Sequence, residues 1–185
     1  MLRDSVFYEN SGGGVTLSGG EPLYQYAFTL ELLQSLKRHG IHTAVETCGF
    51  ASRAHVQSIA EYTDLFLFDY KETDAQKHKA FTGVSNTDIW ENLLLLNALN
   101  KKIVLRCPIV KGLNDTPAHL EGIAKTANRH KNILRVDIEP YHLLGEGKNA
   151  ALGNAVRPFA VASAEEKSRY ISTIQAKTKK PVRLG

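Results

Sequence analysis

Side chains that can bind a small ligand recur in this sequence near the ends of short apolar runs. Ser18, Gly19, Gly20 and Glu21 follow the first run, Glu46 and Thr47 close the second, Asp69 and Lys71 end the third, Arg106 lies within the fourth, and His142 follows the fifth. A lone carboxylate at a strand end often only caps a helix, and a lone buried Arg or His often only supports the fold. Recurrence at the same end of successive strands is not explained by packing, so the set predicts a ligand site.

The charges of this set suit a zwitterionic ligand. Glu21 and Glu46 are carboxylates, which bind an ammonium group through charge-assisted hydrogen bonds. Lys71 and Arg106 bind a carboxylate or a nearby hydroxyl. An amino acid, or a ligand with an amino acid end, carries both complementary groups, and we predict that such a ligand binds here.

A small cation is a second candidate ligand. Asp69, Thr47 and backbone carbonyls offer the hard oxygen ligands that such a cation prefers. The two cysteines, Cys48 and Cys107, lack the close spacing of a metal-ligand pair and are too few for a disulfide framework. We therefore expect both to be buried free thiols.

The sharpest local signal is Gly19-Gly20-Glu21-Pro22. The two glycines have no Cβ, so the backbone can bend and approach a ligand closely, and Pro22 stiffens the exit. A simple Gly-rich turn is the alternative. The segment is not a dinucleotide fingerprint, because Gly12, Gly13 and Gly14 precede a strand, and it lacks the Gly-Lys-Ser/Thr that ends a Walker loop.

Short β-branched or aliphatic runs predict the strands. They cover residues 14–17, 43–47, 65–70, 103–110 and 134–139. Helical spacing between them predicts helices with apolar faces formed by Phe28, Leu32, Leu33 and Leu36, by Val56, Ile59 and Ala60, by Trp90, Leu93, Leu94 and Leu96, by Leu120, Ile123 and Ala127, and by Tyr170, Ile171 and Ile174. Gly40 is a predicted C-terminal cap, Ser52 and Thr116 are predicted N-caps, and residues 163–166 read as a capping box.

Strands that alternate with helices at this spacing predict right-handed βα units and a parallel α/β sheet. About five strands are too few for a closed eight-stranded barrel, so a partial barrel and an open sheet both remain. In either arrangement ligands bind at the C-terminal ends of the strands. We expect residues 1–185 to form a single domain.

Composition narrows the class of protein. The chain has 43% hydrophobic residues, a formal net charge of +4 and no long apolar run, and its start does not resemble a secretory signal. We predict a soluble, cytoplasmic protein that binds neither membrane nor nucleic acid. The basic residues Lys177, Lys179, Lys180 and Arg183 are expected to form a solvated face.

Beyond these patterns, the sequence resembles the radical S-adenosylmethionine activases of glycyl radical enzymes, the family of pyruvate formate-lyase activating enzyme. The resemblance rests on residues 11–23, 40–49, 69–71, 106–110 and 140–142, and it extends over nearly the whole chain. It implies a partial (β/α) barrel of the radical S-adenosylmethionine type, here with about five parallel strands, outer helices and the first βα unit missing. The chain would then be the C-terminal portion of such a barrel.

The resemblance also implies roles for individual residues. Ser18, Gly19, Gly20 and Glu21 would bind the methionine amino group of S-adenosylmethionine, Glu46 would assist the amino group or a monovalent cation, Thr47 and Asp69 would hold that cation, and Lys71, Arg106 and His142 would lie near the carboxylate, ribose or adenine. Many relatives have Asp where this chain has Glu46. No catalytic acid or base is implied.

The largest departure from the family is the absence of its cysteine triplet. The family holds a [4Fe-4S] cluster on a C-x3-C-x2-C loop that precedes the Gly-Gly-Glu-Pro strand, and Cys48 and Cys107 cannot replace it because three thiolates are needed. In the complete enzyme the reduced cluster cleaves S-adenosylmethionine, and the resulting 5′-deoxyadenosyl radical takes a hydrogen from a glycine of the partner. The resemblance implies a pyruvate formate-lyase-like partner and an electron donor such as flavodoxin. This chain alone is expected to bind S-adenosylmethionine without cleaving it.

Three other functions fit parts of the sequence. The chain could be a non-catalytic fragment that only binds S-adenosylmethionine. It could be a radical enzyme that acts on a small molecule, as carboxy-deazaguanine synthase-like proteins do. A Schiff-base aldolase-like barrel that uses Lys71 beside Asp69 is the third.

Overall fold

The computed structural model describes residues 5–142 and 159–185. Its elements follow one another as α1 (Ser5–Ser11), β1 (Gly14–Leu17), the 3-10 helix η2 (Pro22–Gln25), α2 (Tyr26–Arg38), β2 (His42–Thr47), α3 (Arg53–Glu61), β3 (Leu65–Asp69), α4 (Ala75–Thr82), α5 (Thr87–Ala98), β4 (Lys102–Ile109), α6 (Pro117–Arg129), β5 (Ile133–Pro140), α8 (Ala164–Gln175) and β6 (Val182–Leu184). Strands and helices alternate through most of this order, as the sequence predicts.

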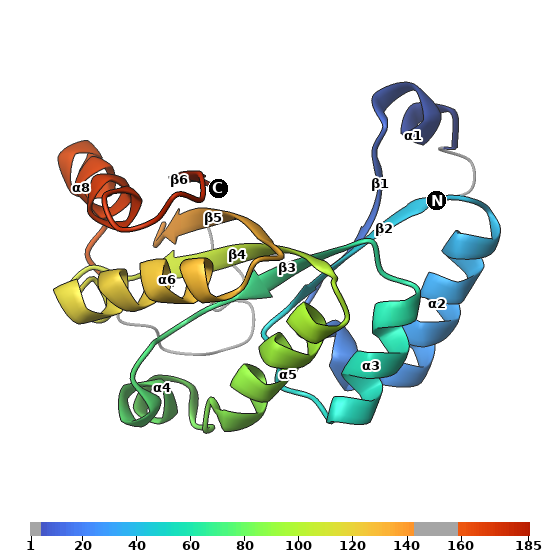
Figure 1. Cartoon of the computed structure of the whole chain (residues 1–185), viewed down its shortest axis with the longest axis horizontal. Coiled ribbons are helices and arrows are strands. Elements are labelled where there is room, and N and C mark those ends of the chain that lie inside the picture. The colour runs from blue at the N-terminus through green and yellow to red at the C-terminus, as the bar shows by residue number, and fades with distance from the viewer. Residues whose placement is uncertain (1–4, 143–158) are drawn as a thin grey trace.

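The strands form a single sheet among the described residues, in the order β1-β2-β3-β4-β5-β6, and every neighbouring pair is parallel (Figure 1). The predicted α/β class with a parallel sheet is confirmed. The sheet has six strands where the sequence indicates about five. The additional strand, β6, has three residues, which is too short to stand out as an apolar run.

Helices cover one face of the sheet and enclose the core. In Figure 1, α2, α3 and α5 lie together beneath the strands. The side chains between the sheet and the helices form the buried core. On the strands they include Val45, Phe66, Phe68, Leu105 and Ile138, and on the helices they include Leu33, Ile59, Leu96 and Ile123, all of them fully buried. Strand residues alternate between the two faces of a sheet, so the residues between these buried ones face away from the helices.

The predicted helix caps are confirmed. Ser52 accepts from the backbone N–H of His55, and Thr116 caps α6 in the same way. Ser163 and Glu166 form the reciprocal capping box of α8. Gly40 follows α2 with φ +70°, a left-handed conformation that glycine adopts without strain.

Two residues predicted for the core are exposed. Phe28 is 62% exposed and lines a hollow together with Leu17 and Gly20 at the end of β1. Leu94 is 45% exposed, because it follows Leu93 on α5 and each helical residue turns about 100° from the last.

Two helices, α1 and α4, were not predicted from the sequence; α4 begins after the N-cap Asp74.

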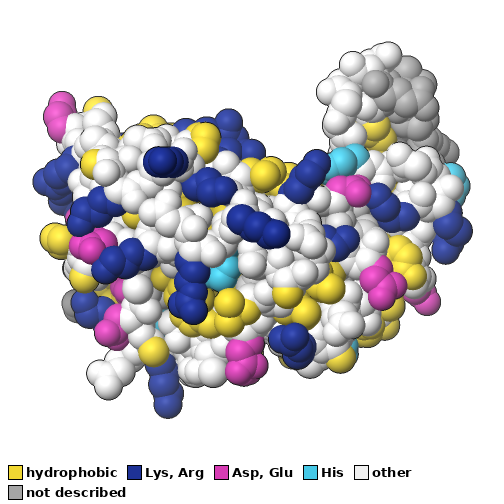
Figure 2. All heavy atoms as spheres, in the orientation of Figure 1, with side chains coloured by type: hydrophobic (Ala, Val, Ile, Leu, Met, Phe, Trp, Pro, Cys, Tyr) yellow, Lys and Arg dark blue, Asp and Glu magenta, His cyan; other side chains and the backbone are white. Residues whose placement is uncertain are grey.

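The surface in Figure 2 carries Lys and Arg side chains spread among neutral and hydrophobic ones, with Asp and Glu between them. None of the helices in the described ranges is both long enough and apolar enough to cross a membrane.

Candidate ligand site at the strand ends

The pairing of the strands brings charged side chains together on the face away from the helices. Asp69 pairs with Arg106 in the register of β3 and β4, so both side chains point to the same face. Glu139 on β5 lies two positions beyond Asp137, the partner of Arg106. We call Glu21, Glu46, Asp69, Lys71, Arg106 and Glu139 the rim cluster, because they lie at or near the C-terminal ends of the strands.

Glu21 is held in one orientation by backbone and side-chain donors. Its Oε1 accepts from the Thr47 hydroxyl at 2.7 Å and from the Leu23 N–H at 3.2 Å, and its Oε2 accepts from the Cys48 N–H at 2.8 Å. A carboxylate offers about four acceptor positions. Three are used, and the Cys48 thiol, a weak donor, also hydrogen-bonds to this carboxylate. A ligand's ammonium group is a stronger donor than the thiol and can take its place.

The glycines before Glu21 are not required by packing inside the chain. A Cβ at Gly19 or at Gly20 would meet no atom within 4 Å. Gly19 has φ +136°, a conformation that other residues rarely adopt, whereas Gly20 has no such constraint. Neither packing nor backbone strain within the described residues therefore requires glycine at position 20.

Arg106 lies between two carboxylates from different strands. Its Nη1 forms an ion pair with Oε1 of Glu46, and its Nε and Nη2 contact Oε1 of Glu139 at 2.9 and 2.8 Å. Oε2 of Glu46 accepts from the Ser18 hydroxyl at 3.0 Å. This chain of contacts connects the loop after β1 with β2, β4 and β5. Glu139 was missed in the sequence, although a charged residue within an apolar strand run is a usable signal.

The Asp69 carboxylate of the rim cluster has a perturbed acidity. Burial raises its pKa to about 6, and the positive charges of Lys71 and Arg106 only partly oppose this effect. The Lys71 Nζ lies 3.9 Å from Asp69 Oδ2, and 40% of the Lys71 side chain is exposed. That exposure does not supply the desolvation that activates a Schiff-base lysine.

Asp69→Asn is expected to stabilise the protein at pH 8. The folded-state pKa of Asp69 is about 6 and its ordinary value is 3.8, so the folded state is penalised above pH 6 by about 2 to 3 kcal/mol in the free energy of unfolding. Asn removes this penalty, and the gain disappears as the pH falls below about 4. Urea unfolding at both pH values measures it.

The control for this variant is Glu31→Gln, which changes an exposed carboxylate on α2. It should leave the free energy of unfolding unchanged within about 0.5 kcal/mol at both pH values. Equal or lower stability of Asp69→Asn at pH 8 would contradict burial as the dominant influence on Asp69.

Two further predicted site residues, Thr47 and His142, lie in different environments, one buried and one exposed. The Thr47 side chain is buried, and its hydroxyl donates to Glu21 and accepts from the Gly49 N–H at 2.9 Å. Its hydroxyl is therefore engaged in two hydrogen bonds within the protein. His142 follows β5, is exposed, and forms no hydrogen bond or ion pair within the described ranges. Within those ranges no group of three or more His, Cys, Asp or Glu side chains has the arrangement of a metal site.

Buried asparagines that were not singled out in the sequence hold the loops of the site. The Asn114 Nδ2 donates to the carbonyls of Lys71 and Pro108 at 2.8 Å each, and its Oδ1 accepts from the Val110 N–H at 2.7 Å. These bonds tie the segment after β3 to the end of β4. Their signal in sequence is weak, because an Asn in a loop usually marks a turn.

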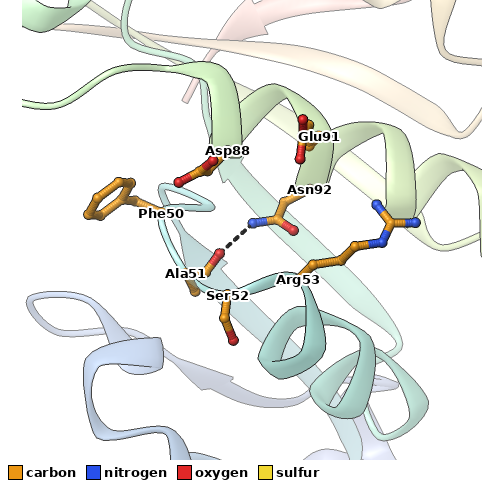
Figure 3. A pocket seen from close by; sticks show the side chains of 7 residues that line it. All are labelled: Phe50, Ala51, Ser52, Arg53, Asp88, Glu91 and Asn92. Carbon is orange, nitrogen blue, oxygen red and sulfur yellow. Dashed lines mark hydrogen bonds between the residues drawn. The ribbon is translucent and has the colours of Figure 1, made fainter.

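Asn92 on α5 has a similar role for the loop after β2. Its Nδ2 donates to the carbonyls of Gly49 and Ala51 at 2.9 and 2.8 Å. Figure 3 shows Asn92 reaching toward Ala51 beside a hollow of about 340 Å³ that Phe50, Arg53 and neighbouring polar residues also line. This hollow contains no member of the rim cluster, so we treat it as separate from the ligand site.

A family model described as the Radical SAM superfamily matches residues 5–126. The chain belongs to the radical S-adenosylmethionine superfamily. Within it, the chain is a homologue of the activating enzymes of glycyl radical enzymes, which confirms the resemblance seen in the sequence.

Two relatives of this radical S-adenosylmethionine protein come from Oleidesulfovibrio alaskensis. The choline trimethylamine-lyase activating enzyme is 43% identical over 154 residues, which are 82% of this chain and 50% of that protein. The isethionate sulfite-lyase activating enzyme is 45% identical over 148 residues, 79% of this chain and 47% of that protein. The chain spans about half the length of these curated relatives.

A solved structure agrees with the fold. A domain of pyruvate-formate lyase-activating enzyme from Bacteroides vulgatus superposes with a TM-score of 0.77 at 25% identity, covering 94% of this chain and 99% of that one. The partial-barrel expectation is thereby confirmed as a radical S-adenosylmethionine fold.

The superfamily implies two groups, and the residues present fit one of them. The rim cluster fits the amino acid end of S-adenosylmethionine, because the oriented Glu21 carboxylate can accept from an ammonium group and the glycines leave room. The residues do not fit a [4Fe-4S] cluster. The chain has two cysteines, of which Cys107 is fully buried and Cys48 partly so, whereas the cluster requires three thiolates from one loop in this family.

Proposed function

We propose that this chain is the S-adenosylmethionine-binding part of an activating enzyme that installs a glycyl radical in a partner enzyme. The observation that carries the proposal is the Glu21 carboxylate, which three donors orient beside Gly19 and Gly20 and whose remaining contact is the weak Cys48 thiol donor. Homology to activating enzymes of choline trimethylamine-lyase and isethionate sulfite-lyase supports a glycyl radical enzyme as the partner.

The residues of the chain bind and orient. Glu21 accepts from the ammonium group, and the backbone at Gly19 and Gly20 lies against the amino acid end. Lys71 and Arg106 attract the carboxylate, and Arg106 is kept in place by Glu46 and Glu139. S-adenosylmethionine, when bound and reductively cleaved with an electron from a donor such as flavodoxin, supplies the group that removes a hydrogen atom from a glycine of the partner.

The chain taken alone lacks the thiolates for a [4Fe-4S] cluster. We therefore expect this chain alone to bind S-adenosylmethionine without cleaving it. A non-catalytic S-adenosylmethionine-binding protein is the alternative function. The two functions share one site and differ in whether a partner glycine is the target.

Calorimetric titration with S-adenosylmethionine and a cleavage assay test the proposal together. The chain is incubated anaerobically with iron, sulfide and dithionite, and 5′-deoxyadenosine is quantified by chromatography. We expect saturable binding and no product above the protein-free blank. The choline trimethylamine-lyase activating enzyme of Oleidesulfovibrio alaskensis is the positive control. An absence of binding would refute the site, and product formation by the chain would refute its expected inactivity.

A further inference from the structure

Glu139 is an acidic residue of the rim cluster to which neither the sequence nor the resemblance assigns a role. Its Oε1 accepts a hydrogen bond from the Nε of Arg106 and forms an ion pair with the Nη2 of the same residue, and 27% of the Glu139 side chain is exposed. The C-terminal Gly185 lies so close to this carboxylate that a Cβ at position 185 would overlap it. Glu139 is thus fixed from two sides.

The charges of the rim cluster do not balance. Its carboxylates are Glu21, Glu46, Asp69 and Glu139, and its cations are Lys71 and Arg106. Four negative groups against two positive ones leave an excess of two negative charges when Asp69 is ionised. Asp137 lies on the same face and pairs with Arg135 and Arg183, and counting these three groups reduces the excess to one negative charge. Arg106 carries one positive charge and contacts both Glu46 and Glu139, so the two carboxylates together leave one negative charge uncompensated.

We propose that Glu139 is a specificity-determining residue that makes the site prefer a positively charged sulfonium over the corresponding neutral thioether. The proposal rests on the proposed function, because it assigns the charge of the S-adenosylmethionine sulfur as the feature that is read. S-adenosylmethionine and S-adenosylhomocysteine share their ammonium, carboxylate and nucleoside groups and differ by the methyl group that creates the sulfonium charge. A fixed carboxylate in a partly buried site stabilises the charged ligand and contributes little to the neutral one.

The test compares dissociation constants for S-adenosylmethionine and S-adenosylhomocysteine in the unaltered chain and in Glu139→Gln. Gln retains the size of Glu and a side-chain oxygen that can accept from Arg106, but it removes the charge. The dissociation constant for S-adenosylmethionine should rise about three- to tenfold. The constant for S-adenosylhomocysteine should change by less than about twofold.

Two variants serve as controls. Glu121→Gln removes a carboxylate that pairs with Lys125 and Lys177 on α6 and the segment after α8, outside the rim cluster, and it should leave the ratio of the two constants unchanged. Glu139→Asp keeps the charge and should retain most of the preference. Should Glu139→Gln fail to fold, the preference of the unaltered chain is measured from low to high salt, where it should decrease because the rim is partly exposed.

The outcomes separate the two proposals. A chain that binds S-adenosylmethionine while Glu139→Gln leaves the ratio unchanged, or weakens both ligands equally, would show that Glu139 only packs against Arg106. For an unfolded variant, a preference that is independent of salt would overturn the inference in the same way. A chain that binds neither ligand would refute the proposed function, and the inference with it.

Discussion

Replacing Glu21 by Ala should weaken the binding of S-adenosylmethionine by about tenfold or more, because a charge-assisted hydrogen bond to the ammonium group is lost. The same change leaves the Cys48 N–H and the Thr47 hydroxyl without their acceptor. The loop after β2 should loosen as well. Calorimetric titration measures the affinity, and Glu31→Ala, an exposed carboxylate on α2, should leave it unchanged.

The thiol of Cys48 gives a readout of the same variant that needs no ligand. Its pKa is raised by burial and by the neighbouring Glu21 carboxylate. Removing Glu21 should lower this pKa, so Cys48 should react faster with a disulfide reagent at pH 8. Cys107 is fully buried and its pKa is raised well above its ordinary value, so it should not interfere. Unchanged affinity and unchanged thiol reactivity would together contradict the assigned position of Glu21.

Asn114→Ala should lower the free energy of unfolding by about 3 to 5 kcal/mol, the largest loss of stability expected among the variants considered. The variant leaves the buried carbonyls of Lys71 and Pro108 and the N–H of Val110 without their Asn114 partner. Because these bonds join the ends of β3 and β4, S-adenosylmethionine should also bind more weakly. Urea unfolding and titration measure the two effects.

Asn128 offers a matched comparison. It is exposed on α6, donates to the Lys177 carbonyl at 2.8 Å and accepts from the Thr178 hydroxyl at 2.7 Å. Water can replace these partners, so Asn128→Ala should cost less than about 1 kcal/mol. A loss for Asn114→Ala no greater than that for Asn128→Ala would show that Asn114 does not join the two strands.

Strand positions were largely predictable from the sequence because parallel strands covered by helices read as short apolar runs. The run at residues 14–17 coincides with β1, and the run at residues 65–70 exceeds β3 by one residue. The helix starts were predictable because Ser52, Thr116 and Ser163 are favoured capping residues. β6 was not predictable, since three residues carry no periodic signal.

The candidate site was predictable as a set of residues and not as a set of contacts. Strand order and the end of each strand place Glu46, Asp69 and Arg106 at the same rim. The contacts between Arg106 and Glu139 depend on the register of β4 and β5, and this register shifts between Ile103 and Val104. Such an irregularity has no reliable sequence signal. The hydrogen bond from the Thr47 hydroxyl to Glu21 likewise depends on the conformation of the segments that follow β1 and β2.

The structure of this chain determined with bound S-adenosylmethionine would test the central claim most directly. The ammonium nitrogen should lie within hydrogen-bonding distance of Glu21 Oε2, with the amino acid end against the backbone of Gly19 and Gly20. The carboxylate should lie on the side of Lys71 and Arg106. Ligand bound elsewhere, for example in the hollow beside Asn92 and Phe50, or bound with its ammonium group away from Glu21, would contradict the claim.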